Sequence, residues 1–299
     1  MIEIWIPITI IAAFSQNLRS IFQKKLQENL SNIGATYVRF AYGLPFVIIY
    51  FFIVNNFSED YLSINEINLE FMLYCTIGGV SQIIATFLLL KIFVTSNFAV
   101  GTVYSKTEPI QAAFFGFILL NEMITLIGFL GILIGLVGII ITAFSKINKT
   151  YSFFSSTVLL GLLSGTLFGL SAVMFRGASH SLYTYNFLLS SAFTLLIAIS
   201  IQTIILTFYI YFTDIKQFHL ILVNWKQSVI VGLFGAVASL CWFYAMSIQN
   251  VAYVRALGQI ELIFTIFASI FYFKEKFKFA ELLGIVITLI GILIILVYV

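Results

Sequence analysis

Charged residues are scarce in this chain, and their scarcity excludes a water-soluble fold. Only 9% of the 299 residues are charged, whereas 61% are hydrophobic. A soluble domain carries about a quarter charged residues, so a surface in contact with water cannot be built from this supply. The sequence therefore predicts an integral membrane protein, with the lipid bilayer as its main surroundings.

Cysteine and histidine are also rare, with two of each. Cys75 and Cys241 lie inside apolar runs and are interpreted as small packing residues rather than a disulfide or a metal pair. His180 and His219 lie near predicted loops, and metal-ligating residue types do not cluster in the sequence. The sequence also lacks His-Glu-x-x-His, Gly-x-Ser-x-Gly and nucleotide-binding motifs, and its net charge of +3 does not indicate a nucleic-acid partner. We therefore expect no enzyme activity, cofactor or metal.

Apolar runs divide the chain into ten candidate membrane spans. Leu126–Phe144 and Leu282–Val299 contain no charged residue, and each approaches the roughly 20 residues that cross a bilayer as a helix. The predicted spans are 4–26, 33–54, 70–93, 98–120, 124–145, 155–177, 183–212, 226–248, 251–273 and 279–298. The predicted fold is an all-α integral membrane protein with ten transmembrane helices and no soluble domain.

A repeat relates the two halves of the sequence. The stretch 97–138 returns at 250–291 with a constant offset of 153 residues and no gap. The matching pairs are Asn97 and Asn250, Glu108 and Glu261, Glu122 and Glu275, Gly131 and Gly284, and Gly138 and Gly291. We predict two five-helix repeats, at 1–145 and 157–299, joined by a loop at 146–156. Because five is an odd number of spans, the second repeat would be inverted in the membrane.

The placement of lysine predicts the orientation. Most lysines lie in or beside the loops that follow the odd-numbered spans. They are Lys24, Lys25, Lys91, Lys146, Lys149, Lys216, Lys226, Lys274, Lys276 and Lys278. The opposite loops hold almost no basic residue, Arg176 being the exception, and one carries Glu59, Asp60 and Glu66. Under the positive-inside rule the lysine-rich side is cytoplasmic, so both termini are predicted to face outward.

An acid-and-glycine pattern ends each repeat. It is Glu122 with Gly131 and Gly138 in the first half, and Glu275 with Gly284 and Gly291 in the second. Phe168-Gly169-Leu170-Ser171, with Arg176 following, adds a further match. In these features the chain resembles the drug/metabolite transporter superfamily, and specifically the ten-helix bacterial proteins made of two EamA-type repeats.

That resemblance implies a fold and an activity. Helices 1–4 and 6–9 would surround a central cavity, with helices 5 and 10 at the periphery. The protein would move small organic solutes, often outward, across the bacterial cytoplasmic (inner) membrane. Some members of the superfamily are described with cytoplasmic termini, whereas the lysines here predict the opposite.

Glu108 and Glu261 are the most informative candidates for a site. Each lies about ten residues into its span, and the repeat relates them. An ionised group at the centre of a membrane helix costs about 2.5–3.5 kcal/mol, so it persists where it faces a cavity or a partner. Pro109 should interrupt its helix beside Glu108. The acids could bind a coupling proton or a substrate amine, or they could form structural ion pairs with Lys106 or Arg255.

Arg255 and Gln259 lie four residues apart and should share a helix face. Glu261 is turned by about 120° from Arg255 on a regular helix, so one helix cannot aim all three groups at one point. Arg255 is predicted near the outer surface. There it could bind a carboxylate at a cavity mouth, or its long side chain could reach toward the interface.

Other polar and aromatic residues are weaker candidates for substrate contacts. Asn17 lies in a mid-span cluster with Gln16 and Arg19, and it could bond substrate or a neighbouring helix. Gln82 and Thr86 share a helix face and could line the cavity. Trp242, Tyr244 and Tyr253 could stack on an organic solute or serve only as packing.

The leading functional hypothesis is a secondary transporter that works by alternating access. It would move a small polar or amphipathic metabolite, with an amino acid or related solute as the first guess and export as the direction. A multidrug or lipophilic-cation exporter is the alternative, and an intramembrane enzyme is the hypothesis from a different class. The expected partners are the solute, the lipid bilayer and a coupling proton, with the protein a monomer or a weak homodimer.

Overall fold

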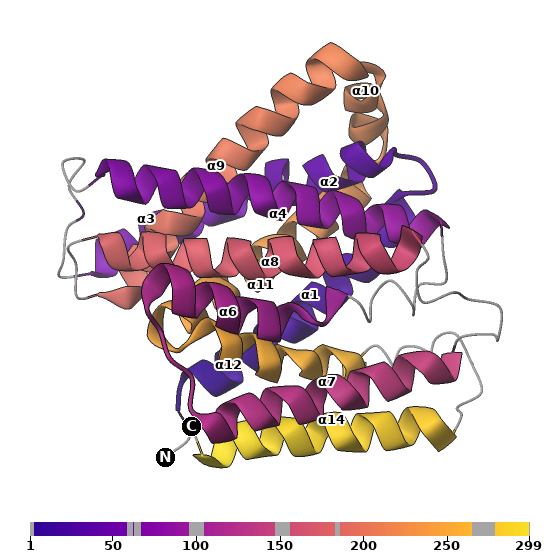
Figure 1. The fold of residues 1–299 in the computed structure, drawn as a ribbon. Coiled ribbons are helices and arrows are strands. Elements are labelled where there is room, and N and C mark those ends of the chain that lie inside the picture. The colour runs from indigo at the N-terminus through magenta and orange to yellow at the C-terminus, as the bar shows by residue number, and fades with distance from the viewer. Residues whose placement is uncertain are drawn as a thin grey trace.

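The computed structural model describes residues 3–58, 62, 67–95, 105–146, 156–182, 186–264 and 279–298, and for 93–95, 143, 145, 146, 156, 157 and 281 only the backbone. This part of the chain is almost entirely helical (Figure 1). The helices are α1 (Trp5–Leu26), α2 (Asn32–Ala41), α3 (Leu44–Phe57), α4 (Leu69–Thr95), α6 (Glu108–Leu120), α7 (Leu126–Lys146), α8 (Ser156–Ser181), α9 (Phe187–Thr213), α10 (Lys216–Val223), α11 (Trp225–Ile248), α12 (Val251–Leu257), the 3-10 helix η2 (Gly258–Ile260) and α14 (Phe279–Tyr298).

Within the described residues, five stretches are long and apolar enough to cross a membrane. They are Asn32–Phe57, Leu69–Ile92, Val158–Ser181, Phe187–Thr213 and Trp225–Ile248. Three shorter apolar helices, Glu108–Leu120, Leu126–Thr142 and Leu282–Tyr298, accompany them. The fold is therefore an all-α membrane protein. The predicted segments 98–104 and 265–273 lie outside the described residues, so the count of ten spans remains a prediction.

Large apolar side chains cover the outside of the helices. Phe57, Leu126 and Phe212 are 75–88% exposed, and many other leucines, isoleucines and phenylalanines are exposed on α3, α9 and α14. A soluble monomer rarely shows apolar patches larger than a few hundred Å². These faces suit contact with lipid.

The predicted span 33–54 is divided into α2 and α3. Pro45 follows directly after Leu44, where α3 begins. Proline lacks an N–H to bond the carbonyl four residues earlier and disfavours helical geometry in the residue before it. The chain bridges the break with a short-range bond, in which Gly43 N donates to Phe40 O at 3.1 Å. The sequence contained this signal, and the prediction of one continuous helix missed it.

Two helix interruptions occur at positions related by the 153-residue offset. Residues 106–107 form a turn just before α6, whose first turn contains Pro109. Residues 258–260 form η2, and residues 261–264 are helical again. The prediction of a break near Pro109 agrees with this geometry. The break after Leu257 was not predicted, so the expectation of a regular helix from 251 onward, in the predicted span 251–273, was wrong.

The helices α7 and α14 pack closely along one side of the molecule (Figure 1). A Cβ added at Gly131 would lie 3.0 Å from the carbonyl oxygen of Gly291, and one at Gly284 would lie 2.5 Å from that of Gly138. Thr288 Oγ1 donates to Gly135 O at 3.4 Å, and these two residues are equivalents in the repeat. The helices are antiparallel. Gly131 contacts Gly291, the equivalent of Gly138, and Gly138 contacts Gly284, the equivalent of Gly131. Such a reciprocal pattern is what a two-fold axis produces.

Most of the other close helix pairings also join the two halves of the chain. Among them are α4 with α8, α1 with α11, α6 with α8, α3 with α9, and α12 with α6. The pairing of α9 with α11 lies within the second half. The halves therefore interlock rather than form separate bodies. The predicted boundaries at 145 and 157 remain predictions.

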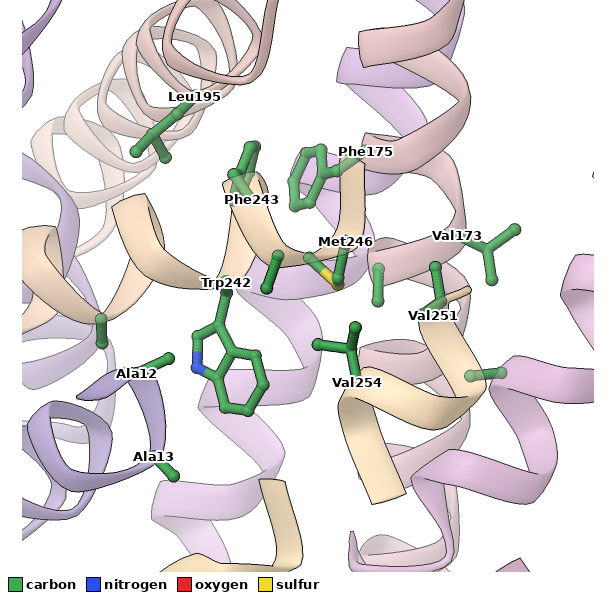
Figure 2. Packing of buried hydrophobic residues seen from close by; sticks show 14 of the residues in the cluster. Ala12, Ala13, Val173, Phe175, Leu195, Trp242, Phe243, Met246, Val251 and Val254 are labelled. Carbon is green, nitrogen blue, oxygen red and sulfur yellow. The ribbon is translucent and has the colours of Figure 1, made fainter. Parts of the chain in front are cut away.

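An apolar core lies where α1, α8, α11 and α12 meet (Figure 2). Trp242 and Met246 of α11 occupy its centre, against Ala12 and Ala13 of α1 and Val254 of α12. The small alanines let the large indole ring approach α1. This packing places the polar edge of Trp242 beside the polar residues of α1.

Candidate functional site

Polar side chains from four regions of the chain meet beside this core. We call them the central ion-pair cluster, and its members are Gln16, Lys106, Glu108, Trp242, Arg255 and Glu261. Three of them come from the first half and three from the second. The cluster lies at the two helix interruptions. Lys106 is in the first and Glu108 directly follows it, while Arg255 and Glu261 lie on either side of η2.

One ion pair joins Lys106 to Glu261. Lys106 Nζ lies 2.5 Å from Glu261 Oε2, and the two side chains are 12% and 10% exposed. Gln16 Nε2 donates to the same carboxylate oxygen at 2.9 Å. Trp242 Nε1 in turn donates to Gln16 Oε1 at 3.0 Å. Glu261 is thus held by α1 and by the turn before α6, both in the other half of the chain.

A second ion pair joins Arg255 to Glu108. Arg255 Nε lies 3.0 Å from Glu108 Oε1, and the two atoms form an ion pair without a hydrogen bond. The guanidinium also lies 4.5 Å from the centroid of the Trp242 ring, within cation–π range. Arg255 is buried, so its side chain does not extend to the protein surface, and its depth in the membrane stays a prediction. An acid and an aromatic face within the protein hold this cation inside.

Gln259 connects the two halves of the chain. Its Nε2 is 3.4 Å from Lys106 O, and these residues are equivalents in the repeat. The same nitrogen is 3.4 Å from Arg255 O, so it ties η2 to α12 and to the other half. The interruption at η2 explains why Arg255, Gln259 and Glu261 act on one region, which a regular helix would not permit.

A small cavity lies next to this cluster. Its volume is about 10 Å³, close to what one water molecule needs. Lys106 and Gln259 form its polar side, and Ile132, Gly135 and Thr288 close it from α7 and α14.

Gln82 and Thr86 belong to a second group of polar residues. Thr86 Oγ1 accepts a 2.6 Å hydrogen bond from Arg39 Nη1, and Gln82 Oε1 accepts one of 2.9 Å from Gln202 Nε2. Both residues of α4 are buried. The structure therefore pairs them with α2 and α9 and does not place them on the wall of the small cavity.

The remaining candidates differ in position. Asn17 is buried on α1, next to Gln16. Tyr244 lies two residues beyond Trp242 and so points to the opposite side of α11, where it neighbours Tyr50. Tyr253 is buried, and its hydroxyl accepts a 2.8 Å hydrogen bond from Thr125 N at the start of α7. Tyr253 therefore serves packing, and Tyr244 lies apart from the cluster.

Arg176 and Glu122 form a separate ion pair at the end of α8. Arg176 Nε lies 2.5 Å from Glu122 Oε1, and Arg176 Nη1 donates to Met246 O and, at 2.8 Å, to Gln249 O. Asn250 Nδ2 donates to the other oxygen of Glu122 at 3.1 Å. We call these residues the Arg176 clamp, since one guanidinium ties the turn after α6 to the end of α11. Asn97 and Glu275, the repeat equivalents of Asn250 and Glu122, lie outside the described residues.

Two residues at the site were missed as primary candidates. Gln16 links Trp242 to Glu261, and Arg19, one turn along α1, is almost completely buried. Both stood in the polar cluster of the first span, and Arg19 carries a charge in mid-helix. That charge was the available signal, because an uncompensated cation in an apolar helix needs a partner.

The chain matches one protein family over nearly its whole length. The EamA-like transporter family matches residues 3–144 and again residues 155–297. The comparison with curated proteins found no match. One solved structure, titled only "Crystal structure of protein", is 12% identical, covers 97% of this chain and 95% of its own, and aligns with a TM-score of 0.68. At this identity the likeness shows the fold alone. The two family matches show more: this chain is a member of the EamA-like transporter family, and hence a multi-pass membrane transporter of the drug/metabolite type.

Proposed function

We propose that the protein is a secondary transporter that works by alternating access. It moves a small polar or amphipathic metabolite, with an amino acid or related solute as the first choice, outward across the bacterial cytoplasmic membrane. The moving units are the two repeats, 1–145 and 157–299, linked by 146–156. Both termini face outward, and the working form is a monomer or a weak homodimer.

One observation carries this proposal: both intramembrane acids are bound by cations across the two halves. Glu108 of the first half meets Arg255 of the second, and Glu261 of the second meets Lys106 of the first. Any ligand that takes a carboxylate away from its cation weakens the contact between the halves. Binding would thus be coupled to their relative movement.

A proton is one such ligand. Protonation of Glu261 would remove its negative charge. The ion pair with Lys106 would then be lost, and the lysine side chain could move away from the carboxyl group. The amine of a zwitterionic solute could compete for the same carboxylate. Either event exchanges one internal interaction for another, so the cost of breaking a buried ion pair is offset in part.

The balance of charge favours an acidic or zwitterionic solute over a lipophilic cation. Arg19, Arg39, Lys106 and Arg255 are set against two acids, Glu108 and Glu261. A site for cations would need acids in excess, with aromatic faces left open. Trp242, the aromatic side chain in this cluster, is already covered by Arg255. A multidrug exporter is therefore the alternative outcome of the test below.

Flux in proteoliposomes tests the proposal. The purified protein is reconstituted, and uptake of labelled amino acids is measured with and without an imposed proton gradient. We expect flux in the intact protein and its loss in Glu108→Gln and Glu261→Gln. Glu28→Gln, an exposed acid near the end of α1, is the matched control and should keep full activity.

Two results would change the assignment. Flux of lipophilic cations in place of amino acids would support the multidrug alternative. Hydrolytic activity of the purified protein, with no solute flux, would indicate an intramembrane enzyme and overturn the proposal.

A further inference from the structure

Arg19 is a buried guanidinium with almost no partners in the described part of the chain. It is 3% exposed, and its Nε and Nη1 atoms have no hydrogen-bond partner there. Its Nη2 reaches only Ser20 Oγ, at 3.5 Å. Leaving a buried charged donor unsatisfied is expensive, because the group has lost its water without replacement.

Arg39 lies close to Arg19, and it too is a buried guanidinium with an unsatisfied donor. It is 5% exposed, and its Nε has no partner among the described residues. Its strongest charged neighbours are Arg19 and Arg255, both cations. One nitrogen bonds Thr86, and the guanidinium lies 5.0 Å from the Phe40 ring. Three arginines from α1, α2 and α12 therefore gather in one region.

Gly235 of α11 makes room for two of these arginines. A Cβ placed there would lie 3.5 Å from Arg19 Cδ and 3.6 Å from Arg39 Cγ. Both stems thus cross the same glycine, and their guanidinium groups project from it. The repeat equivalent of Gly235 is Gln82, a polar side chain that would have filled the space.

The charges of this region do not balance. The region holds four cations, Arg19, Arg39, Lys106 and Arg255, and two acids, Glu108 and Glu261. Lys106 and Arg255 are paired with the acids, so two positive charges are left over among the described residues. Glu261, the acid that acts most strongly on Arg19, is already bound to Lys106 and Gln16. A buried excess of cations in a membrane protein is a signature of a site for something negatively charged.

We infer that Arg19, together with Arg39, is the anion-binding part of the transport site and holds the carboxylate or phosphate of the solute. A guanidinium presents five donors in a plane and matches the two oxygens of such a group. The inference rests on the proposed transport function and narrows its substrate to solutes with an oxyanion. Because Arg19 is buried here, the solute reaches it when the helices around Gly235 separate.

Matched pairs of solutes test this inference on the intact protein. Thermal unfolding of the detergent-purified protein is followed with amino acids, their methyl esters and the amines that lack the carboxylate, and separately with sugar phosphates. We expect at least one acid or phosphate to raise the unfolding temperature, while its ester or dephosphorylated form does not. The carboxylate and phosphate arms then identify the source of the oxyanion. This comparison needs no mutation, so it holds even if a variant fails to fold.

The variant Arg19→Gln gives the second measurement. The affinity for the stabilising acid should fall by about tenfold or more, the effect of losing a charge-assisted hydrogen bond. Affinity for the ester should not change. Lys25→Gln, which removes an exposed cation of the same helix, should leave both affinities as they were.

The outcomes separate this inference from the proposed function. If proteoliposomes carry esters or amines as well as acids, and Arg19→Gln changes neither, the anion site is wrong and the transporter stands. If no member of the panel is bound or carried, both are overturned.

Discussion

Glu261 binds two side chains of the other half within the central ion-pair cluster. One of its oxygens accepts from Lys106, in the turn before α6, and from Gln16 of α1, both in the other half. Attraction between the charges is strong at low dielectric, but each charge also loses hydration. The pair therefore adds little net stability, whereas the loss of one member leaves the other buried without compensation.

This asymmetry gives a prediction that separates structure from transport. Glu261→Gln alone should lower the free energy of unfolding by about 3–5 kcal/mol, because Lys106 stays buried and charged. The double variant Lys106→Met with Glu261→Gln should recover most of that loss. Thermal unfolding in detergent measures both.

Flux then decides the role of the pair. The double variant should remain inactive in proteoliposomes although it is stable. A stable double variant with normal flux would show that the pair is only structural.

Gly258 permits the close contact between η2 and Trp242. A Cβ at this position would lie 2.5 Å from Trp242 Cη2. We predict that Gly258→Ala displaces the indole, weakens its bond to Gln16 and costs about 1–3 kcal/mol, as overpacking does. Tryptophan fluorescence and thermal unfolding should both change.

The matched control for this substitution is Gly116→Ala. No heavy atom lies within 4 Å of a Cβ at Gly116, and alanine favours a helix by about 1 kcal/mol over glycine. This variant should be at least as stable as the parent. Equal effects of the two substitutions would contradict the packing described around Trp242.

Sequence reasoning found most of the residues that meet at the site. Glu108, Glu261 and Lys106 stood out because charges are rare in apolar helices, and the structure brings them together. The sequence did not show which acid pairs with Lys106 and which with Arg255, since a regular helix would have turned Arg255 and Glu261 apart. Tyr244 was selected by residue type alone, and helix geometry places it on the other side of α11.

At the scale of helices, interruptions were harder to predict than spans. Pro109 signals its break through a missing N–H. Gly258 gives a weaker signal, because glycine also occurs within membrane helices for packing. The indole of Trp242 packs directly against Gly258, and a contact between such distant segments is not visible in any local sequence pattern. The short helix α10, in the predicted loop 213–225, was likewise missed.

The pairing of α7 with α14 depends on particular glycines. A Cβ at Gly138 would clash with Gly284 O and Thr288 N, whereas one at Gly135 meets no heavy atom within 4 Å. We predict that Gly138→Ala separates the helices and lowers stability by about 1–3 kcal/mol. Gly135→Ala, on the same helix and facing the small cavity, should be neutral or stabilising in thermal unfolding. A Gly138→Ala variant as stable as Gly135→Ala would show that the contact is not close.

On the scale of the whole molecule, the structure shows two contacts between residues that the 153-residue offset relates. Lys106 meets Gln259, and Gly135 meets Thr288, each with its own equivalent. A residue can contact its own repeat equivalent only if both lie near the two-fold axis that relates the halves. The interlocking of the halves was not evident from the sequence, since periodicity and composition contain no information on which helix packs against which.

Orientation in the membrane gives a prediction for the molecule as a whole. Cysteines are introduced at Glu3 and Tyr298, in a background where Cys75 and Cys241 are serine. Figure 1 shows both chain ends at the same end of the molecule. Under the positive-inside rule, an impermeant maleimide should label both cysteines on intact cells. Lys25→Cys lies at the end of α1 on the predicted cytoplasmic side and should stay unlabelled. Labelling of Lys25→Cys with both chain ends protected would show that the termini face the cytoplasm.

The glycine seam between α7 and α14 has a consequence for ancestry. Two unfused five-helix chains, inserted in opposite directions, would touch through this same surface, glycine 131 of one against glycine 138 of the other. In such a homodimer, every substitution at either position would occur in both chains and alter both symmetry-related contacts. A single polypeptide that carries both copies is free of that constraint, and its two copies can differ in charge, as Lys106 and its uncharged counterpart Gln259 do.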